Sequence, residues 1–371
     1  MVVEGMKPAI SAKQANLLGL DKSDLRQLAG VSGQPPYRGA QLFRDIYARR
    51  QRDFAACTEL PGDFRQLLNS QYRLAYPEVR GRVESRDGSI RYLLSLEDGE
   101  SIETVYMPEE GRATLCVSSQ VGCALNCRFC FTALLGAKRN LAPGEIVGQI
   151  LAVAGAEQLS PGAPLNVVFM GMGEPLLNLE SVMKAARILA DPEGPGIALR
   201  RITISTAGIV PKIYELGREA HRPRLAISLN ASSDEQRTAL MPLNRKYPLS
   251  ELLAACRAFP PGPRERLTFE YVVLDGINDA DSDAQSVATL LRGIRSKVNL
   301  IPYNAGPGLP YQPSPLRQVL AFQRILHEHH VPTFIRISRG QDIMAACGQL
   351  RLAGVESGTA PIQTAQPLSP G

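Results

Sequence analysis

The sequence predicts an α/β protein built on a complete or partial (β/α) barrel, with a helical N-terminal accessory domain and a small β extension. The chain has 371 residues, which suits one large domain plus an accessory part. Hydrophobic residues make up 44% and charged residues 21%, as in folded globular proteins. From residue 113 onward, strand-like runs alternate with helical patterns. This alternation indicates parallel strands joined by helical crossovers.

The composition also argues against several classes of protein. No stretch of the sequence approaches ~18 uninterrupted apolar residues, so we expect no membrane span. The N-terminus carries Glu4 and Lys7 and lacks the continuous apolar core of a secretion signal, so a cytoplasmic protein is expected. The net charge of +5 permits a nucleic-acid partner without requiring one.

Residues 1–76 have helical patterns. One helix is expected to have Ser23 as its N-cap and to end at Gly30. A second pattern over 38–50 places apolar side chains on one face. Arginines are enriched from Pro36 to Arg52, and they could bind RNA phosphates or simply form a solvated helix face.

The later regions are distinguished by their periodicity. Residues 77–112 alternate in the manner of strands and form a β-rich linker. The barrel core is expected over 113–350, and the small, polar, proline-rich segment 351–371 is expected to be a disordered tail. The strand-like runs of the barrel are 113–119, 165–170, 200–206, 224–229, 267–274, 297–303 and 333–338. Helical patterns between them include Pro143–Glu157, Leu179–Leu189, Pro211–Arg218 and Asp283–Gly293.

Unusual residues follow these strands at their C-terminal ends, where parallel barrels carry their active sites. In chain order they are a three-cysteine loop, the run Gly171–Pro175, Ser205 with Thr206, Ser228 to Asn230, Asn304 and Cys347. Their convergence predicts a functional site at this end of the barrel.

The three-cysteine loop has the spacing Cys-x3-Cys-x2-Cys, formed by Cys123, Cys127 and Cys130. Seven cysteines, an odd count, make a disulfide framework improbable. Three thiolates leave one iron of a cubic iron–sulfur cluster open to a chelating substrate. The alternative is a zinc site completed by Cys116 or a histidine. The four histidines lie far away in the sequence, which weakens that alternative.

Several longer blocks carry a family resemblance. They are "PYRGAQLF", "CVSSQVGCALNCRFC", "VFMGMGEPLLN", "ISTAGIV", "MPLNRKYPL", "FEYVVLDGIND", "VNLIPYN" and "AACGQL". In this order, over about residues 20 to 350, they resemble the RlmN/Cfr family of RNA methyltransferases in the radical S-adenosylmethionine (SAM) superfamily. The resemblance implies a partial (β/α)6 barrel with an N-terminal RNA-binding domain.

The resemblance also implies the chemistry. The family makes 2-methyladenosine at adenosine 2503 of 23S rRNA and adenosine 37 of tRNA, using two SAM molecules and an S-methylcysteine intermediate. Carbon 2 of adenine lies between two ring nitrogens and is a poor nucleophile, which explains the need for a radical route. A [4Fe-4S] cluster, SAM, a flavodoxin-type reductant and a monomeric, membrane-free enzyme are expected by this resemblance.

The family's catalytic positions can be carried over residue by residue. Cys347 matches the cysteine that is methylated, and Cys116 matches the one that resolves the RNA adduct through a transient disulfide. Glu103 matches the proposed proton acceptor. The cluster ligands match Cys123, Cys127 and Cys130. From the residues alone, Cys347 could be a core cysteine, Cys116 an inward strand residue, and Glu103 a solvated carboxylate.

The SAM contacts of the family match a second set of positions. They are Gly173, Glu174, Ser205, Ser228, Leu229, Asn230 and Asn304. The family often has histidine where Asn230 stands, and asparagine forms hydrogen bonds but does not titrate near neutral pH. Two alternative functions remain: Cfr-type methylation of adenosine carbon 8, and a non-catalytic, metal-stabilised RNA-binding protein.

Overall fold

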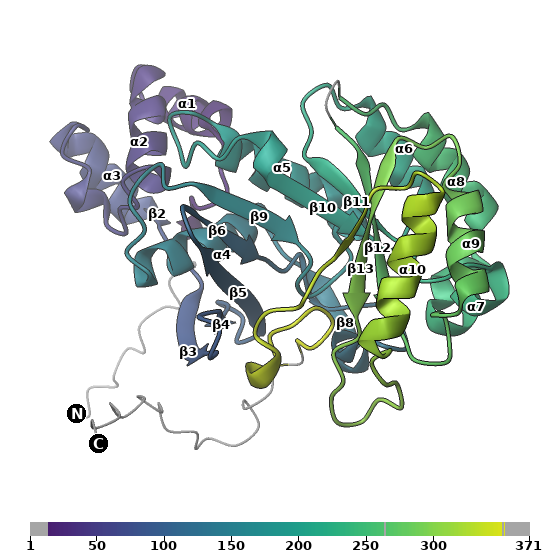
Figure 1. The fold of residues 1–371 in the computed structure, drawn as a ribbon. Coiled ribbons are helices and arrows are strands. Elements are labelled where there is room, and N and C mark those ends of the chain that lie inside the picture. The colour runs from purple at the N-terminus through teal and green to yellow at the C-terminus, as the bar shows by residue number, and fades with distance from the viewer. Residues whose placement is uncertain (1–13, 263–264, 351, 353–371) are drawn as a thin grey trace, which may run out of the picture.

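The computed structural model describes residues 14–262, 265–350 and 352. It has an open, curved sheet of ten strands in the order β14-β13-β12-β11-β10-β9-β6-β5-β4-β3, with N-terminal helices at one end and the last helix at the other (Figure 1). None of the helices in these residues combines the length and apolar character needed to cross a membrane. The expected tail lies, except for Leu352, outside the described residues.

Parallel strands form the barrel part of this sheet. They are β6 (Arg112–Cys116), β9 (Leu165–Phe169), β10 (Ile202–Thr206), β11 (Arg224–Ser228), β12 (Leu267–Val273), β13 (Ser296–Pro302) and β14 (Thr333–Ile335). Spatial order follows chain order, and β14 does not pair with β3. The barrel is therefore partial, as predicted.

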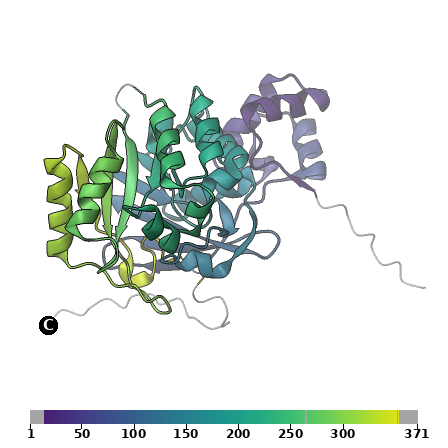
Figure 2. The ribbon, with the colours of Figure 1, turned by 90° about the vertical axis from the view of Figure 1, so that its right-hand side faces the viewer.

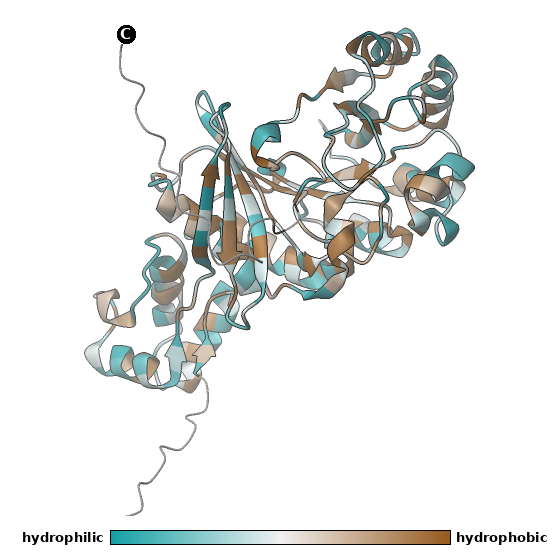
Figure 3. Ribbon diagram, turned by 90° about the horizontal axis from the view of Figure 1, so that it is seen from below, coloured by the Kyte–Doolittle hydropathy of each residue, from teal (hydrophilic) through white to brown (hydrophobic). Residues whose placement is uncertain are grey.

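Helices cover the convex face of the barrel, as the two perpendicular views show (Figures 1 and 2). They are α4 (Pro143–Ala156), α5 (Leu179–Ala190), α6 (Val210–Arg218), α7 (Asp234–Leu240), α8 (Leu249–Ala258), α9 (Asp281–Leu290) and α10 (Leu316–Glu328). Apolar and polar residues intermingle along the helices and strands (Figure 3). In β9 the burial alternates: Leu165, Val167 and Phe169 are buried, whereas Val168 borders the barrel interior.

The N-terminal part consists of α1 (Lys22–Val31), α2 (Tyr37–Tyr47) and α3 (Gly62–Gln71), with β1 (Ala15–Asn16) pairing β2 (Tyr72–Arg73). The predicted N-cap Ser23 is wrong. Asp21 caps α1, because its carboxylate accepts the N–H groups of Ser23 and Asp24, while Asp24 reaches back to the Asp21 N–H. This reciprocal capping box places the helix start earlier than the serine alone suggested.

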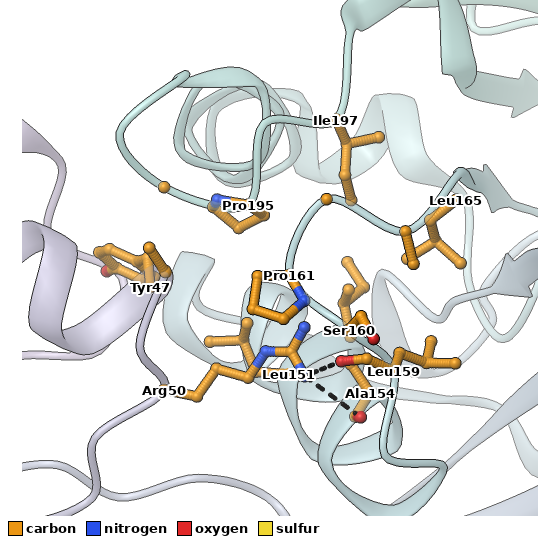
Figure 4. A pocket seen from close by; sticks show the side chains of 15 residues that line it. Tyr47, Arg50, Leu151, Ala154, Leu159, Ser160, Pro161, Leu165, Pro195 and Ile197 are labelled. Carbon is orange, nitrogen blue, oxygen red and sulfur yellow. Dashed lines mark hydrogen bonds between the residues drawn. The ribbon is translucent and has the colours of Figure 1, made fainter.

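These helices are fastened to the barrel by specific contacts. Lys22 forms ion pairs of 2.7 and 2.6 Å with Asp191 and Glu193. Where the N-terminal helices meet the barrel, a small cavity of about 40 Å³ is bordered by Tyr47 and by the connection between α4 and β9 (Figure 4). Arg50 reaches across it to donate hydrogen bonds to the carbonyls of Ala154 and Leu159, at the C-terminal end of α4 (Figure 4). A cation satisfying these carbonyls stabilises the helix end.

The β extension continues the barrel sheet. Strands β3 (Glu78–Glu84), β4 (Ile90–Ser95) and β5 (Ser101–Glu109) are antiparallel, and β5 pairs with β6. The C-terminal segment is tied to this extension, because Gly340 N–H donates to the Asp87 carboxylate at 2.7 Å. The sheet is thus continuous from the extension into the barrel.

Candidate functional site

The cysteine loop is held by a short hairpin at the C-terminal end of β6. Strands β7 (Gln120–Gly122) and β8 (Ala137–Asn140) are antiparallel and flank the loop. Gly122 has φ +75°, and a Cβ there would lie 1.8 Å from the carbonyl oxygen of Gly136. The Cys123 N–H donates to that same oxygen at 2.8 Å. The close crossing requires glycine and fixes where the first cysteine leaves the hairpin.

All three cysteines border one cavity of about 170 Å³. Burial raises the pKa of Cys123 to about 11 and also raises the pKa values of Cys127 and Cys130. For Cys127 the charges of the neighbouring cysteines add to the rise. Thiolates are therefore costly here unless bound metal compensates their charge, which is how a metal site couples to thiol ionisation.

The number of these thiols fits one kind of metal group. Three cysteines of one loop border the same cavity. A cubic cluster held by three cysteines keeps one iron free for a further ligand. The loop therefore has the donor set that such a cluster requires.

The Gly171–Pro175 turn forms a second wall of this cavity. Gly173 has φ +99°, and a Cβ would lie 2.5 Å from the Cβ of Gln120. The buried carboxylate of Glu174 accepts the Leu176 and Ala207 N–H groups at 2.9 and 2.8 Å, which joins this turn to the end of β10. Burial raises the pKa of Glu174 to about 7. A cation placed beside this carboxylate would favour its ionised form.

The ends of β10 and β11 complete the same wall. Ser205, Ser228 and Asn230 border the cavity, whereas Leu229 is buried behind it. Asn230 has φ +56°, a conformation that asparagine tolerates better than most side chains. Its amide oxygen accepts the Val272 N–H at 2.8 Å, which ties β11 to β12. The Asn230 side chain therefore holds the ends of β11 and β12 together by a hydrogen bond to the backbone, and asparagine can do this without titrating.

A buried arginine that the motifs did not reveal supports this wall from behind. Arg237 is fully buried in α7. Its guanidinium donates to the carbonyls of Ala207 at 2.6 Å and Ser228 at 3.2 Å, and to the side chain of Asn244 at 3.1 Å. Burial lowers the pKa of Arg237 to about 10. No local sequence signal distinguishes this arginine from one on a helix surface.

Asn304, after β13, lies where the cavity meets the C-terminal loop. Its amide nitrogen donates to the Ser338 hydroxyl at 2.9 Å and to the Cys347 carbonyl at 3.3 Å. Its side-chain oxygen is buried and has no hydrogen-bond partner among the described residues. Such an unpaired acceptor is costly unless a ligand supplies a donor, so the cavity fits a ligand with N–H or O–H groups.

Cys347 lies in a loop held against the cysteine loop by backbone contacts. The Phe131 N–H donates to the Gly348 carbonyl at 2.8 Å, and the Thr132 hydroxyl donates to the Leu350 carbonyl at 2.7 Å. Cys347 borders both the cavity that contains the three loop cysteines and a second cavity of about 510 Å³ inside the barrel. Its accessible surface faces these cavities, while the surrounding protein raises its pKa to about 11.

Cys116 borders the same interior cavity from β6. Burial raises the pKa of its thiol, and the charge of Cys347 adds to the rise. Two cysteines far apart in the sequence thus lie near each other in the fold. Cys57 and Cys256 are instead buried in the hydrophobic core, at 0% and 2% exposure.

Glu103 has a different setting from the other candidate residues. It is buried in β5, where its carboxylate pairs with Arg91 at 3.0 Å and accepts the Leu352 N–H at 3.2 Å. The described linings of the two cavities do not include it. The N-terminal arginines are also engaged: Arg49 pairs with Asp45 at 2.6 Å, and Arg44 lies 3.7 Å from Glu59. Their positive charge is therefore partly neutralised within the protein.

Comparison with known proteins first defines the class. Residues 117–285 match the model of the radical SAM superfamily, and residues 15–74 match the ribosomal RNA large subunit methyltransferase N-terminal domain. A crystal structure of a radical SAM methyltransferase from Sphaerobacter thermophilus superposes with a TM-score of 0.86 at 43% identity, covering 91% of this chain and 99% of that one. The fold is therefore that of a radical SAM protein.

The relatives then define the family. A probable dual-specificity RNA methyltransferase RlmN of Koribacter versatilis is 51% identical, covering 86% of this chain and 96% of that protein. The dual-specificity RNA methyltransferase RlmN of Syntrophobacter fumaroxidans is 49% identical, covering 86% and 92%. This chain belongs to the RlmN family, as the motifs predicted.

Proposed function

We propose that this chain is the methyltransferase that makes 2-methyladenosine in 23S rRNA and tRNA, at adenosine 2503 and adenosine 37. Its relatives are RNA methyltransferases by name, and membership in their family makes it an enzyme of that class. The observation that carries the proposal is the position of Cys347. It lies between the cavity bordered by the three loop cysteines and the interior cavity that contains Cys116.

The residues present fit the family's cofactors. Cys123, Cys127 and Cys130 would hold the [4Fe-4S] cluster. SAM would contact Gly173, Glu174, Ser205, Ser228, Leu229, Asn230 and Asn304. When bound, the reduced cluster and SAM together supply a carbon radical, the chemistry that an electron-poor ring carbon requires.

The chain's own groups orient SAM. The Glu174 carboxylate would hold the SAM ammonium. Glu174 borders the cluster-side cavity, and its two oxygens already accept the N–H groups of Leu176 and Ala207, which fixes the position of the carboxylate. The unpaired oxygen of Asn304 would accept a hydrogen bond from a SAM amine. Arg237 keeps the strand ends in place from behind and would not touch SAM itself.

Cys347 and Cys116 would divide the methyl-transfer work. The Cys347 sulfur would carry the methyl group. That group would give one hydrogen atom to the SAM-derived carbon radical, and its carbon would then bond to adenine while the ring loses a proton and an electron passes to the oxidised cluster. The Cys116 thiolate would then attack the Cys347 sulfur, so that a disulfide forms while the carbon–sulfur bond breaks. The released electron pair goes to the methyl carbon, which takes a proton. The family resemblance assigns the proton lost from the ring to Glu103, although in this fold Glu103 pairs with Arg91 at 3.0 Å and does not border either cavity.

The same proposal covers the partners. The N-terminal domain, residues 1–76, would bind RNA, and residues 77–112 would join it to the barrel of residues 113–350. A flavodoxin-type reductant, a monomeric state and a cytoplasmic location complete it. The N-terminal match to a ribosomal RNA methyltransferase domain supports the RNA-binding role.

Nucleoside mass spectrometry tests the function directly. Total rRNA and tRNA from cells with and without the gene are digested and compared. We expect 2-methyladenosine in both RNA classes only when the gene is present. Appearance of 8-methyladenosine without 2-methyladenosine would instead assign the chain to Cfr-type chemistry. A colourless, zinc-containing protein from anaerobic purification, without iron or sulfide, would favour the non-catalytic alternative.

A further inference from the structure

The interior cavity carries a pattern that the proposed function does not explain. It adjoins the cluster-side cavity, because Met170, Glu270, Ile301 and Cys347 border both. A carboxylate therefore lies where the two cavities meet, near the cysteine proposed to carry the methyl group. None of the roles proposed above involves Glu270.

Glu270 forms a pair with Asn299 on the neighbouring strand. The two residues are partners in the parallel register of β12 and β13. The Asn299 amide nitrogen donates to Oε1 of Glu270 at 2.9 Å. The two side chains are largely buried, with Glu270 8% and Asn299 9% exposed. The contact fixes both groups in the wall of the interior cavity.

This contact leaves two acceptors without donors. Across the described part of the chain, neither Oε2 of Glu270 nor Oδ1 of Asn299 accepts a hydrogen bond. The neighbouring cations, Lys297 and Arg336, influence the charge of Glu270 but form no ion pair with it within 4.0 Å. Neither oxygen is among the buried, unpaired side-chain atoms of the described residues, so both are open to the cavity and can accept a hydrogen bond from a ligand there.

We propose that Glu270 and Asn299 bind the exocyclic amino group of the target adenine, flipped out of its RNA into the interior cavity. The inference rests on the proposed function. Enzymes that modify a base within RNA or DNA read the flipped base through hydrogen bonds to its edge. The adenine amine donates two hydrogen bonds, whereas guanine and hypoxanthine present a carbonyl oxygen that two acceptors would repel. Glu270 and Asn299 therefore select adenine.

The charge of the cavity is consistent with an RNA nucleotide. Four basic side chains border it: Arg112, Lys297, Arg336 and Arg339. Arg112 pairs with Glu109 at 2.6 Å and Arg339 lies 3.8 Å from Asp87, whereas Lys297 and Arg336 form no ion pair within 4.0 Å among the described residues. Cations beside a bound base would neutralise its phosphates.

The test uses reconstituted enzyme and two RNAs that differ only at the target. One carries adenosine and the other purine riboside, which lacks the amino group but keeps the hydrogen on carbon 2. The measured quantity is the ratio of kcat/KM values for the two RNAs. Comparing this ratio between enzymes removes the difference in intrinsic reactivity of the two bases. The variants are Glu270→Ala, Glu270→Gln and Asn299→Ala, with the exposed Glu251→Gln on α8 as the control.

We expect Glu270→Ala to lose roughly 10- to 100-fold of the preference for adenosine, the usual size of a lost recognition contact. Asn299→Ala should lose less of this preference. Glu270→Gln should retain part of the preference, because the glutamine amide oxygen can still accept a hydrogen bond from the adenine amino group. An unchanged ratio in both alanine variants overturns the proposal. Loss of S-methylation of Cys347 in Glu270→Gln also overturns it, by assigning the carboxylate to SAM. Native enzyme that makes no 2-methyladenosine overturns the proposed function together with this inference.

Discussion

The two cavities that meet at Cys347 differ in how they are built. The cluster-side cavity is shaped by loops whose backbone groups are tied together, as Glu174 ties its own turn to Ala207. The interior cavity is walled by strands, and its charged groups, such as Lys297 and Arg336, project from the sheet. A small cofactor needs a fixed, closely fitting site. A large anionic RNA needs distributed charge with one or two reading contacts. On the proposed function, this difference would separate binding of the methyl donor from binding of its acceptor.

The largest expected effect comes from removing Cys347, one of the four residues that border both cavities. Cys347→Ala should lower RNA methylation by roughly 10³-fold or more, because the methyl carrier is lost. Cluster assembly and SAM binding should persist, since the other cavity walls remain. RNA methylation, iron content and SAM binding are measured together. Cys256→Ala, a core cysteine, is the matched control and should keep its activity. Normal methylation by the Cys347 variant would remove this cysteine from the mechanism.

Next in size is the effect of removing Cys116, the cysteine that borders the interior cavity but not the cluster-side cavity. Cys116→Ala should still become methylated at Cys347 but should remain covalently attached to RNA, because no thiol can resolve the adduct. A denaturing gel with labelled RNA detects the attached species. If the variant methylates Cys347 under turnover conditions and yields no RNA-linked protein, the resolving role is wrong.

A smaller effect concerns pH on the cluster side. Burial raises the pKa of Glu174 to about 7. Below that pH the carboxyl group is neutral and must release a proton to hold the SAM ammonium. SAM affinity should therefore rise up to tenfold per pH unit from about pH 5 to about pH 7 and then level off. Equilibrium dialysis across this range measures it. A Glu174→Gln profile as steep as the native one would show that another group controls the pH dependence.

The smallest effect is expected at one charge of the interior cavity. Arg336→Gln should raise KM for RNA a few-fold and reduce the salt slope of RNA binding by about one. The side chain is exposed and borders the cavity. The control is Arg317→Gln, an exposed arginine on α10. If the salt dependence of RNA binding is the same in Arg336→Gln, Arg317→Gln and the native enzyme, the RNA contacts lie outside the interior cavity.

Local motifs predicted the cluster loop and the turn at Gly173 because their chemistry depends on residues close in the chain. The spacing of Cys123, Cys127 and Cys130 allows one loop to present three thiols. At Gly173 the φ of +99° is local to the turn, whereas the close approach of Gln120, a residue far away in the sequence, comes from the tertiary structure. The sequence also predicted that the residues after successive strands lie at the same end of the barrel, because parallel crossover connections bring the C-terminal ends of all these strands to one edge.

Other features could not be read from the sequence, because strand register and long-range packing create them. Glu270 meets Asn299 only through the pairing of β12 with β13. The N-terminal arginines looked available for RNA until the fold placed Asp45, Glu59 and the α4 carbonyls beside them.

The motifs alone therefore established the family, the barrel and the chemistry of the cysteine loop, since each depends on spacing along the chain. Tertiary structure decided which thiols approach one another and where Arg237 supports the strand ends. It also decided that Glu103 is paired with Arg91 rather than bordering a cavity. Each of these depends on side chains from distant segments meeting in space, and one-dimensional patterns do not encode such contacts.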